Sequence, residues 1–255
     1  MIEKLPFNVD VEKLKSNLEE IKKIPVTWQA KEFGYKNFGG WSVLSRSGQC
    51  DDGWETANAL FQYSNNKPYK YHLAHYLKVS HPFEHINKTP ACFDEIERII
   101  DLLEENGFYP RRARISLLAG NTSSFVHSDA PWPEDNLIGN YICRIHVPII
   151  TNKNCIHWTE KGEFHMPADG SVYMFPVNNL HQIRNTSNED RYHLIMDAYD
   201  TRGFTQTMRF NDEIEKLERS AKQFRYKMDR TNFNFLHKSV FFVATHLVNF
   251  TKKYK

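Results

Sequence analysis

Four short, β-rich runs separated by turn-forming residues constrain the fold of this chain more than any other feature. They read "RARISLLAG", "CRIHVPIIT", "GSVYMFPV" and "RYHLIMDAY", and turn segments such as "ADG" and "NTSNED" lie between them. Several short strands at near-regular spacing predict an antiparallel sandwich or barrel, not a parallel α/β sheet. No glycine-rich phosphate loop follows any of these runs in the sequence, which argues against a nucleotide-binding fold.

Two helices and one further strand are expected outside these runs: residues 10–23, residues 92–107 and Trp41–Arg46. In both predicted helices apolar residues recur at intervals of three and four, which is the period of a helix with one buried face. Asp10 is placed to cap the first helix, and Gly107 is a stop signal for the second.

The C-terminal region, residues 204–255, returns to a helical pattern with an apolar stripe. Two interpretations stay open: the helix packs on the strand-rich domain, or it forms a dimerisation surface. We favour the first. The predicted organisation is therefore one domain over residues 1–203 and a helical extension, residues 204–255, packed on it.

Charge and composition narrow the class of protein. The net charge is +2, but from Phe204 onward there are 11 lysines and arginines against 5 aspartates and glutamates, a balance of +6 that leaves −4 for the first 203 residues. Such a basic region is more often a solvated helical face than a binding surface, so no nucleic-acid partner is expected.

The cysteines and the apolar stretches bear on the compartment. Four cysteines lie far apart without a Cys-x-x-Cys pair, which fits a reducing compartment better than a disulfide framework. The first residues have no apolar core of a secretory signal, and "SVFFVATHLVNF" is too short and too polar to span a bilayer. A cytoplasmic protein without a membrane partner is expected.

The stretch "FVHSDAPW" places a histidine and an aspartate two residues apart, His127 and Asp129. In an extended strand, residues i and i+2 point to the same face, so this pair can hold a metal ion together. It can equally be a hydrogen-bonded pair on the surface. The stretch alone leaves both interpretations open.

The run "MFPVNNLHQIRNTSNEDRYHLIMD" predicts a hairpin with its loop near Asn185–Asp190. His181 and Arg191 are equidistant from Thr186, so in such a hairpin they would face each other across the ladder. This is a hypothesis about register, because a slip of one residue would put them on opposite faces.

Taken together, these residues suggest one chemistry. Two imidazoles and one carboxylate on one side of a metal ion form the facial arrangement of non-haem Fe(II) oxygenases. The remaining coordination positions suit a chelating 2-oxo acid and dioxygen. The far carboxylate of the oxo acid then needs a planar, permanently charged partner, and Arg191 is placed for it.

The segments "HSD", "CRIHVPIITN" and "GSVYMFPVNNLHQIRNTSNEDRYHLIMD", in that order, resemble the aspartyl/asparaginyl β-hydroxylase family of Fe(II)/2-oxoglutarate oxygenases. The resemblance covers roughly Arg112 to Asp200. The members of this family include bacterial proline hydroxylases. It implies a mainly β fold with flanking helices, built on a double-stranded β-helix, the jelly-roll or cupin-like core.

The resemblance also implies roles for individual residues. The implied iron ligands are His127, Asp129 and His181. The implied partners of the distal carboxylate of 2-oxoglutarate are Arg191 and Ser116, and the pair implied to reach into the active site is Arg144 and His146. Asp129 places the chain with the members that have all three iron ligands, and it argues against a halogenase, which needs that position empty.

The implied reaction is hydroxylation of an unactivated C–H bond of an amino acid, free or within a peptide, with conversion of 2-oxoglutarate and dioxygen to succinate and carbon dioxide. Candidate substrate contacts are Arg144, Arg46, Trp132, Trp41 and Asn140, each of which can equally be an ordinary packing or loop residue. "CIHWTEKGEFHM" is interpreted as a surface hairpin without chemistry, and His193 as a residue that either shapes the cosubstrate pocket or is structural. Two rival classes remain, a different metal-dependent enzyme on a jelly roll and a non-catalytic binding protein.

Overall fold

The structure is a computed structural model, and it describes residues 2–28, 37–52, 85–124, 126, 142–175 and 180–202. The chain divides into two units, residues 1–55 with 82–205 and residues 56–81 with 206–255. All described residues belong to the first unit. The helical extension expected over residues 204–255, its packing and its role in dimerisation therefore lie outside the described residues and stay predictions.

The described residues form two helices and twelve strands. The helices are α1 (Val11–Ile21) and α3 (Asp94–Glu105). The strands are β1 (Glu3–Asn8), β2 (Thr27–Trp28), β3 (Phe38–Ser45), β4 (Asn87–Lys88), β5 (Phe108–Leu118), β6 (Thr122–Ser123), β7 (Ile142–Ile150), β8 (Cys155–Thr159), β9 (Gly162–Phe164), β10 (Ser171–Phe175), β11 (His181–Asn185) and β12 (Arg191–Asp200).

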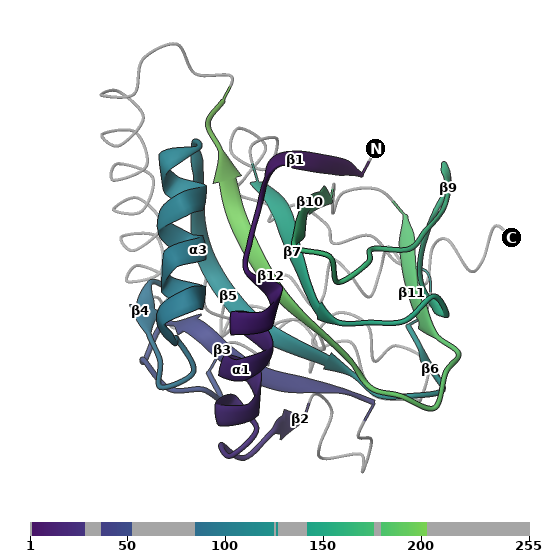
Figure 1. Ribbon diagram of the computed structural model, residues 1–255, viewed down its shortest axis with the longest axis horizontal. Helices are drawn as coiled ribbons and strands as arrows, with labels where there is room; N and C mark the ends of the chain where they lie inside the picture. Colours follow the sequence, from purple (N-terminus) through teal and green to yellow (C-terminus); the bar gives the residue numbers. More distant parts are fainter. Residues whose placement is uncertain are drawn as a thin grey trace, which may run out of the picture. The chain divides into compact units, whose positions relative to one another are not determined.

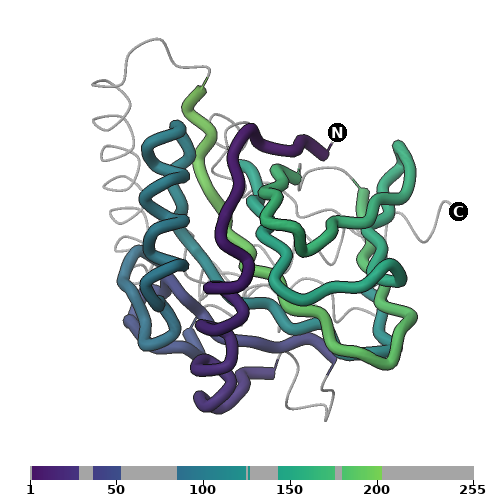
Figure 2. The backbone as a smooth tube through the Cα atoms, viewed as in Figure 1, coloured from purple at the N-terminus to yellow at the C-terminus, as the bar shows by residue number. Residues whose placement is uncertain are grey.

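These strands make two antiparallel sheets. The larger has the order β1-β10-β7-β12-β5-β3-β2, with β4 paired to β3, and the smaller has the order β6-β11-β8-β9. From β5 onward the chain passes back and forth between the two sheets: β5, β7, β10 and β12 belong to the larger, and β6, β8, β9 and β11 to the smaller (Figures 1 and 2). The prediction of a mainly β, antiparallel architecture is confirmed.

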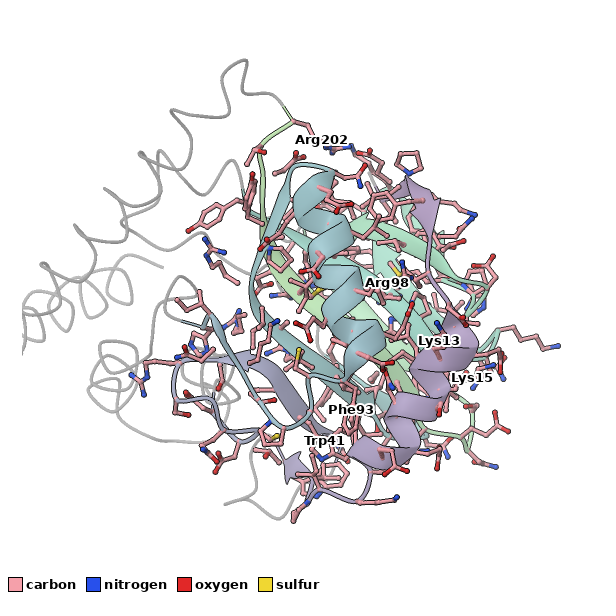
Figure 3. The ribbon with its side chains drawn as sticks, turned by 60° about the vertical axis from the view of Figure 1, so that its left-hand side comes forward. Lys13, Lys15, Trp41, Phe93, Arg98 and Arg202 are labelled. Carbon is pink, nitrogen blue, oxygen red and sulfur yellow. The ribbon has the colours of Figure 1, made fainter. Side chains whose placement is uncertain are left out.

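The two helices cover one face of the larger sheet. Figure 3 shows α1 and α3 side by side over it, with the exposed side chains of Lys13 and Arg98 pointing away. The residues facing the sheet are fully buried in one apolar core, and from the helices these are Leu14, Leu18, Ile21, Ile96, Ile99, Ile100 and Leu103. The helical periodicity read from the sequence is confirmed, because it marks this buried face.

The predicted helix signals are also confirmed. The Oδ1 of Asp10 accepts hydrogen bonds from the backbone N–H groups of Glu12 and Lys13, both at 3.1 Å, and so caps α1. Gly107 follows the end of α3 with φ of 81°, a left-handed conformation that favours glycine. The strand expected at Trp41–Arg46 is β3, which begins three residues earlier and ends at Ser45.

Trp41 belongs to the core beneath the helices. Its side chain is 1% exposed, and its Nε1–H donates to the carbonyl of Ile24 at 2.8 Å. The prediction that it walls a substrate pocket is thereby corrected, because alternation along β3 turns this side chain toward the helix-side core. It is a packing residue.

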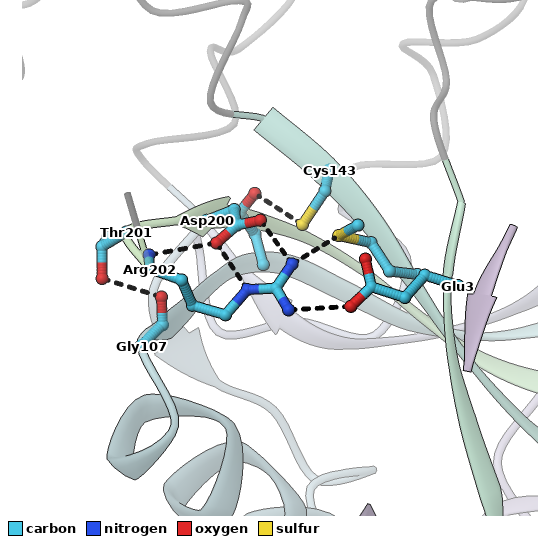
Figure 4. Close-up of polar contacts among 8 residues, drawn as sticks. Glu3, Gly107, Cys143, Asp200, Thr201 and Arg202 are labelled. Atoms are coloured by element: carbon cyan, nitrogen blue, oxygen red, sulfur yellow. Dashed lines mark hydrogen bonds and ion pairs between the residues drawn. The ribbon is translucent and has the colours of Figure 1, made fainter. Parts of the chain in front are cut away.

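Arg202 joins the end of β12 to the N-terminal strand. Its guanidinium pairs with Asp200 at 2.8 Å and with Glu3 of β1 at 2.9 Å, as Figure 4 shows. The same guanidinium lies 4.5 Å from the centre of the Phe108 ring, at the start of β5. Three strands are therefore linked at this end of the larger sheet.

Two further expectations bear on the chain as a whole. All four cysteines are free, as expected from their spacing. Among the described residues, neither helix is long enough and apolar enough to cross a bilayer.

Candidate functional site

The larger sheet has a polar face opposite its helix-covered face. On β12, Leu194 and Met196 enter the core below the helices, so Arg191, His193 and Asp197 point the other way. Residues directly opposite each other on paired strands share a face, so the neighbouring strands β5 and β7 add three residues to this one. Ser116 lies opposite His193. His146 lies opposite Ile195, and Arg144 lies opposite Asp197. The structure thus brings Ser116, Arg144, His146 and Arg191 onto one face.

The smaller sheet turns a second set of buried residues toward that face. His181 and His157 share a face of this sheet, since Thr159 lies opposite His181 and Ile183 opposite His157. The ring of His157 lies 5.3 Å from that of His146 and 5.9 Å from that of His193, centre to centre. The two sheets therefore enclose a common interior.

The predicted ladder between His181 and Arg191 is wrong. His181 begins β11, which pairs with β6 and β8, whereas Arg191 begins β12, which pairs with β5 and β7. The turn at residues 186–190 carries the chain from one sheet to the other and does not close a hairpin. Both side chains are nonetheless buried, 8% and 2% exposed, because each lies on the inner face of its own sheet.

Asn185 holds this turn in shape. Its Nδ2 donates to the carbonyl of Glu189 at 2.7 Å and, more weakly, to those of Leu118 and Ala119. Its Oδ1 accepts from the Oγ of Ser187 at 2.7 Å. A buried asparagine with this many local bonds fixes where β12 starts and therefore where Arg191 lies.

Three histidines cluster in the interior: His146, His157 and His193. Each contributes a ring nitrogen to a set whose members all lie within 4.8 Å of one another, so among the described residues this group could hold a metal ion. Phe175 of β10 contacts the rings of both His146 and His157, and it also packs 5.1 Å from His181. The ring of Phe175 therefore lies beside His181 as well as beside two members of the cluster.

Burial sets the protonation of these groups. Desolvation lowers the pKa of His146, His157 and His193 well below the ordinary value, and the nearby positive charge of Arg191 lowers it further. All three imidazoles are therefore neutral. Both ring nitrogens of His157 and the Nε2 of His193 have no hydrogen-bond partner within the described part of the chain.

Arg191 is a buried cation. Loss of solvation lowers its pKa to about 10, so it stays charged at neutral pH. Its Nη1 lies 3.5 Å from the Nδ1 of His193, and its Nε has no hydrogen-bond partner. No carboxylate in the described ranges pairs with it. A buried charge without a counter-charge is costly, and such a site calls for an anion.

Asp197 lies two positions beyond Ile195 on the same face. Its Oδ1 accepts from the Nε of Arg144 at 2.9 Å, and its Oδ2 accepts from the Nε of Arg112 at 2.8 Å. Burial raises its pKa, but Arg112, Arg144 and Arg114 together lower it more, so the carboxylate stays ionised.

Several predicted site residues are not tested by this geometry. His127, Asp129, Trp132 and Asn140 lie outside the described residues, so their roles stay predictions. His181 is described and buried, and its role as an iron ligand also stays a prediction. Arg46 follows the end of β3, and its side chain is exposed.

Sequence reasoning missed two residues of this interior. The sequence predicts that His157 lies on a surface hairpin; β8 and β9 do form a hairpin, but the His157 side chain is buried, 4% exposed. Asp197 has no role in the sequence-based prediction. The alternation of side chains along a strand was the available signal, because Asp197 lies six residues after Arg191 and so shares its face.

Comparison with known families identifies the chain. Residues 12–201 match the family described as aspartyl/asparaginyl beta-hydroxylase. The chain belongs to this family. The match extends well beyond the segment from Arg112 to Asp200 that carries the resemblance in the sequence, and it includes α1 from its second residue, α3 and all strands from β2 to β12.

Two solved structures are remote likenesses of this hydroxylase-family chain. An oxidoreductase of the 2OG-Fe(II) oxygenase family from Burkholderia pseudomallei is 13% identical, with a TM-score of 0.45 over 78% of this chain and 84% of that one. A prolyl-4-hydroxylase from Pseudomonas putida is 11% identical, with a TM-score of 0.40 over 78% of this chain and 91% of that one. A search of curated proteins finds no match.

Proposed function

We propose that this protein is an Fe(II)- and 2-oxoglutarate-dependent dioxygenase that hydroxylates an unactivated C–H bond of an amino acid, free or within a peptide. Membership of the aspartyl/asparaginyl beta-hydroxylase family supports hydroxylation. The passage of strands between two sheets supports a double-stranded β-helix as the scaffold, which is the fold proposed for the enzyme core.

The observation that carries the proposal is the buried guanidinium of Arg191. It lies on the inner face of β12 with an unpartnered Nε and with no acid beside it among the described residues. A dicarboxylic oxo acid supplies the missing negative charge at its distal end, and a guanidinium binds such a carboxylate through two parallel hydrogen bonds. Ser116 shares this face diagonally across from Arg191 and can add a hydroxyl donor.

The residues present fit the proposed metal as far as the structure describes them. His181 is a buried imidazole at the first position of β11, on the inner face of the smaller sheet. We propose that it binds Fe(II) together with His127 and Asp129, a set of two nitrogens and one carboxylate that suits this ion. When bound, the metal supplies the activation of dioxygen coupled to oxidative decarboxylation of 2-oxoglutarate.

The chain's own residues position the reactants and exclude water. Arg191 orients the oxo acid by its far end, and the apolar ring of Phe175 lies beside His181. The histidines that line the interior are neutral, so they add no positive charge that would compete with Arg191 for the carboxylate. Exclusion of solvent strengthens each of these electrostatic contacts.

The substrate end is proposed to include Arg144. Its Nε is held by Asp197, so the plane of its guanidinium is fixed on the inner face of β7. A fixed guanidinium suits a carboxylate of an amino acid or of an acidic side chain. The other proposed substrate contacts are Arg46, Trp132 and Asn140. Trp41 is no longer among them, because it lies in the core.

The first test is spectroscopic. Under anaerobic conditions, the purified full-length chain with Fe(II) and 2-oxoglutarate is expected to develop a visible charge-transfer band. In air it is expected to release succinate slowly without a substrate. Arg191→Gln removes the charge and should raise the Kd for 2-oxoglutarate by about tenfold to a hundredfold, the range for a lost charged hydrogen bond.

Arg184→Gln is the matched control. Arg184 lies on β11, half-exposed, and pairs with Glu163 on the surface, so its replacement should leave the band and the Kd unchanged. If neither band nor succinate forms with the wild-type chain, the proposed function is wrong, and a different metal or a non-catalytic role takes its place. A panel of amino acids and peptides, screened by mass spectrometry for a 2-oxoglutarate-dependent gain of one oxygen atom, then identifies the substrate.

A further inference from the structure

The protonated nitrogen of His193 can be assigned from its contacts. The Nδ1 of His193 lies 3.5 Å from both the Nη1 of Arg191 and the Nδ1 of His146. A guanidinium donates hydrogen bonds and cannot accept them, so we assign this Nδ1 as the acceptor, and the Nδ1 of His146 can then donate to it as well. A neutral imidazole has one N–H. The proton of His193 is therefore on Nε2, and this nitrogen is a buried donor with no acceptor in the described part of the protein.

His157 gives a second donor of the same kind. Both of its nitrogens are buried without partners, and in a neutral ring one of the two carries a proton. His157 stacks on His193, with the ring planes inclined by 26°. With the Nε of Arg191, the interior thus holds three buried N–H donors from two sheets and no protein acceptor among the described residues.

Such a group can serve a metal ion or an oxyanion. A metal ion would add two positive charges next to the buried guanidinium of Arg191, and it could not use a nitrogen that carries a proton. Asp197 lies on the same face but is already paired with Arg112 and Arg144. An oxyanion accepts from all three donors and neutralises the guanidinium. The charge and the donors both favour the oxyanion.

We propose that His193 and His157 donate hydrogen bonds to the oxyanion that pairs with Arg191, so that these three side chains form one carboxylate-binding site in the interior. The assignment to a carboxylate of 2-oxoglutarate rests on the proposed function. The tautomer of His193 and the binding of a dicarboxylate do not depend on the proposed function.

Paired variants test the donor itself. The amide nitrogen of glutamine lies near the position of Nε2 in histidine, and that of asparagine near Nδ1. His193→Gln should therefore bind 2-oxoglutarate within about threefold of wild type, whereas His193→Asn should lose about tenfold or more, as expected for a hydrogen bond to a charged group. His157→Leu, which removes both nitrogens, should also lose about tenfold.

His165→Asn is the control. His165 is exposed on the segment after β9, and its Nδ1 bonds the carbonyl of Cys155 at 3.2 Å, so asparagine keeps that bond and no binding change is expected. Affinities are measured by calorimetry on the full-length chain with Fe(II), without oxygen. Pyruvate, a 2-oxo acid without a distal carboxylate, is the second probe, and its affinity should be the same in all four variants. The proposal would be overturned if His193→Asn and His157→Leu lost the same affinity for pyruvate as for 2-oxoglutarate, or lost affinity for neither.

Two readouts are independent of the iron chemistry. Long-range proton–nitrogen NMR spectra of the metal-free chain, assigned with His193→Gln, should show His193 with its proton on Nε2; a proton on Nδ1 overturns the assignment. Glutarate, which has two carboxylates and no oxo group, should bind the metal-free chain and bind His193→Asn about tenfold more weakly.

These readouts separate the two proposals. If the wild-type chain gives no charge-transfer band and no succinate but glutarate binding depends on His193, the proposed function fails and the carboxylate site stands. If succinate forms and His193→Asn binds 2-oxoglutarate normally, the proposed function stands and the carboxylate site with His193 is wrong. Binding of Co²⁺ that persists in His181→Ala and disappears in His157→Leu would make the three histidines a metal site and overturn the proposal.

Discussion

The carboxylate of Asp197 accepts a hydrogen bond from the Nε of Arg144 at 2.9 Å, across the pairing of β12 with β7. From the other side, β5 supplies Arg112 to the same carboxylate. One buried acid therefore joins three adjacent strands on the face that lines the interior. It also fixes the orientation of Arg144, the residue proposed to meet the substrate.

Replacement of Asp197 should destabilise the fold. Asp197→Asn keeps the size of the side chain but removes the negative charge that pairs with the buried Arg112 and the partly buried Arg144. We expect the free energy of unfolding to fall by about 3–5 kcal/mol, the usual cost of breaking a buried ion pair. Urea denaturation measures it. Asp101→Asn, an exposed change on α3, should alter it by less than about 0.5 kcal/mol; similar effects of both changes would contradict this account.

The same carboxylate predicts a dependence of stability on pH. Its pKa is lowered in the folded state by Arg112 and Arg144 despite burial, so its contribution is complete above the unfolded pKa of about 3.9. Protonation removes that contribution as the pH falls below this value. The stability difference between wild type and Asp197→Asn should thus be constant from about pH 7 to 5 and shrink below about pH 4. A difference that stays constant down to pH 2.5 would exclude this linkage.

Asn185 should matter more than its exposed neighbour in the same turn. Asn185→Ala removes the bonds that hold residues 186–190, and we expect a loss of about 2–3 kcal/mol in unfolding free energy because buried backbone carbonyls lose their donor. Asn188→Ala removes one exposed bond to Asn121 and should cost less than about 1 kcal/mol. Equal losses would show that Asn185 does not hold the turn.

Trp41 should affect stability and not binding. Trp41→Phe removes the hydrogen bond to Ile24 and reduces the volume of a core ring, so unfolding free energy should fall by about 1–3 kcal/mol. The Kd for 2-oxoglutarate, measured by calorimetry, should be unchanged because the side chain lies on the helix-covered face. A higher Kd for 2-oxoglutarate with unchanged stability would show that Trp41 does line the binding pocket.

The sequence by itself determined the local elements and singled out two residues of the interior. The helix α1, its cap at Asp10, the end of α3 at Gly107 and the β-rich runs depend on interactions within a few residues, so periodicity and turn chemistry predict them. The family motifs singled out His181 and Arg191, and both are buried in the interior.

Only the tertiary structure decided how the strands pair. His181 and Arg191 lie ten residues apart with a turn between them, a spacing that fits a hairpin as well as a passage between sheets. Which of the two forms depends on the distant strands available for pairing. Here β11 pairs with β6 and β8, and β12 pairs with β5 and β7. The same long-range packing buried His157 and placed Asp197 between two arginines, because which face of a strand is covered depends on partners far away in the sequence.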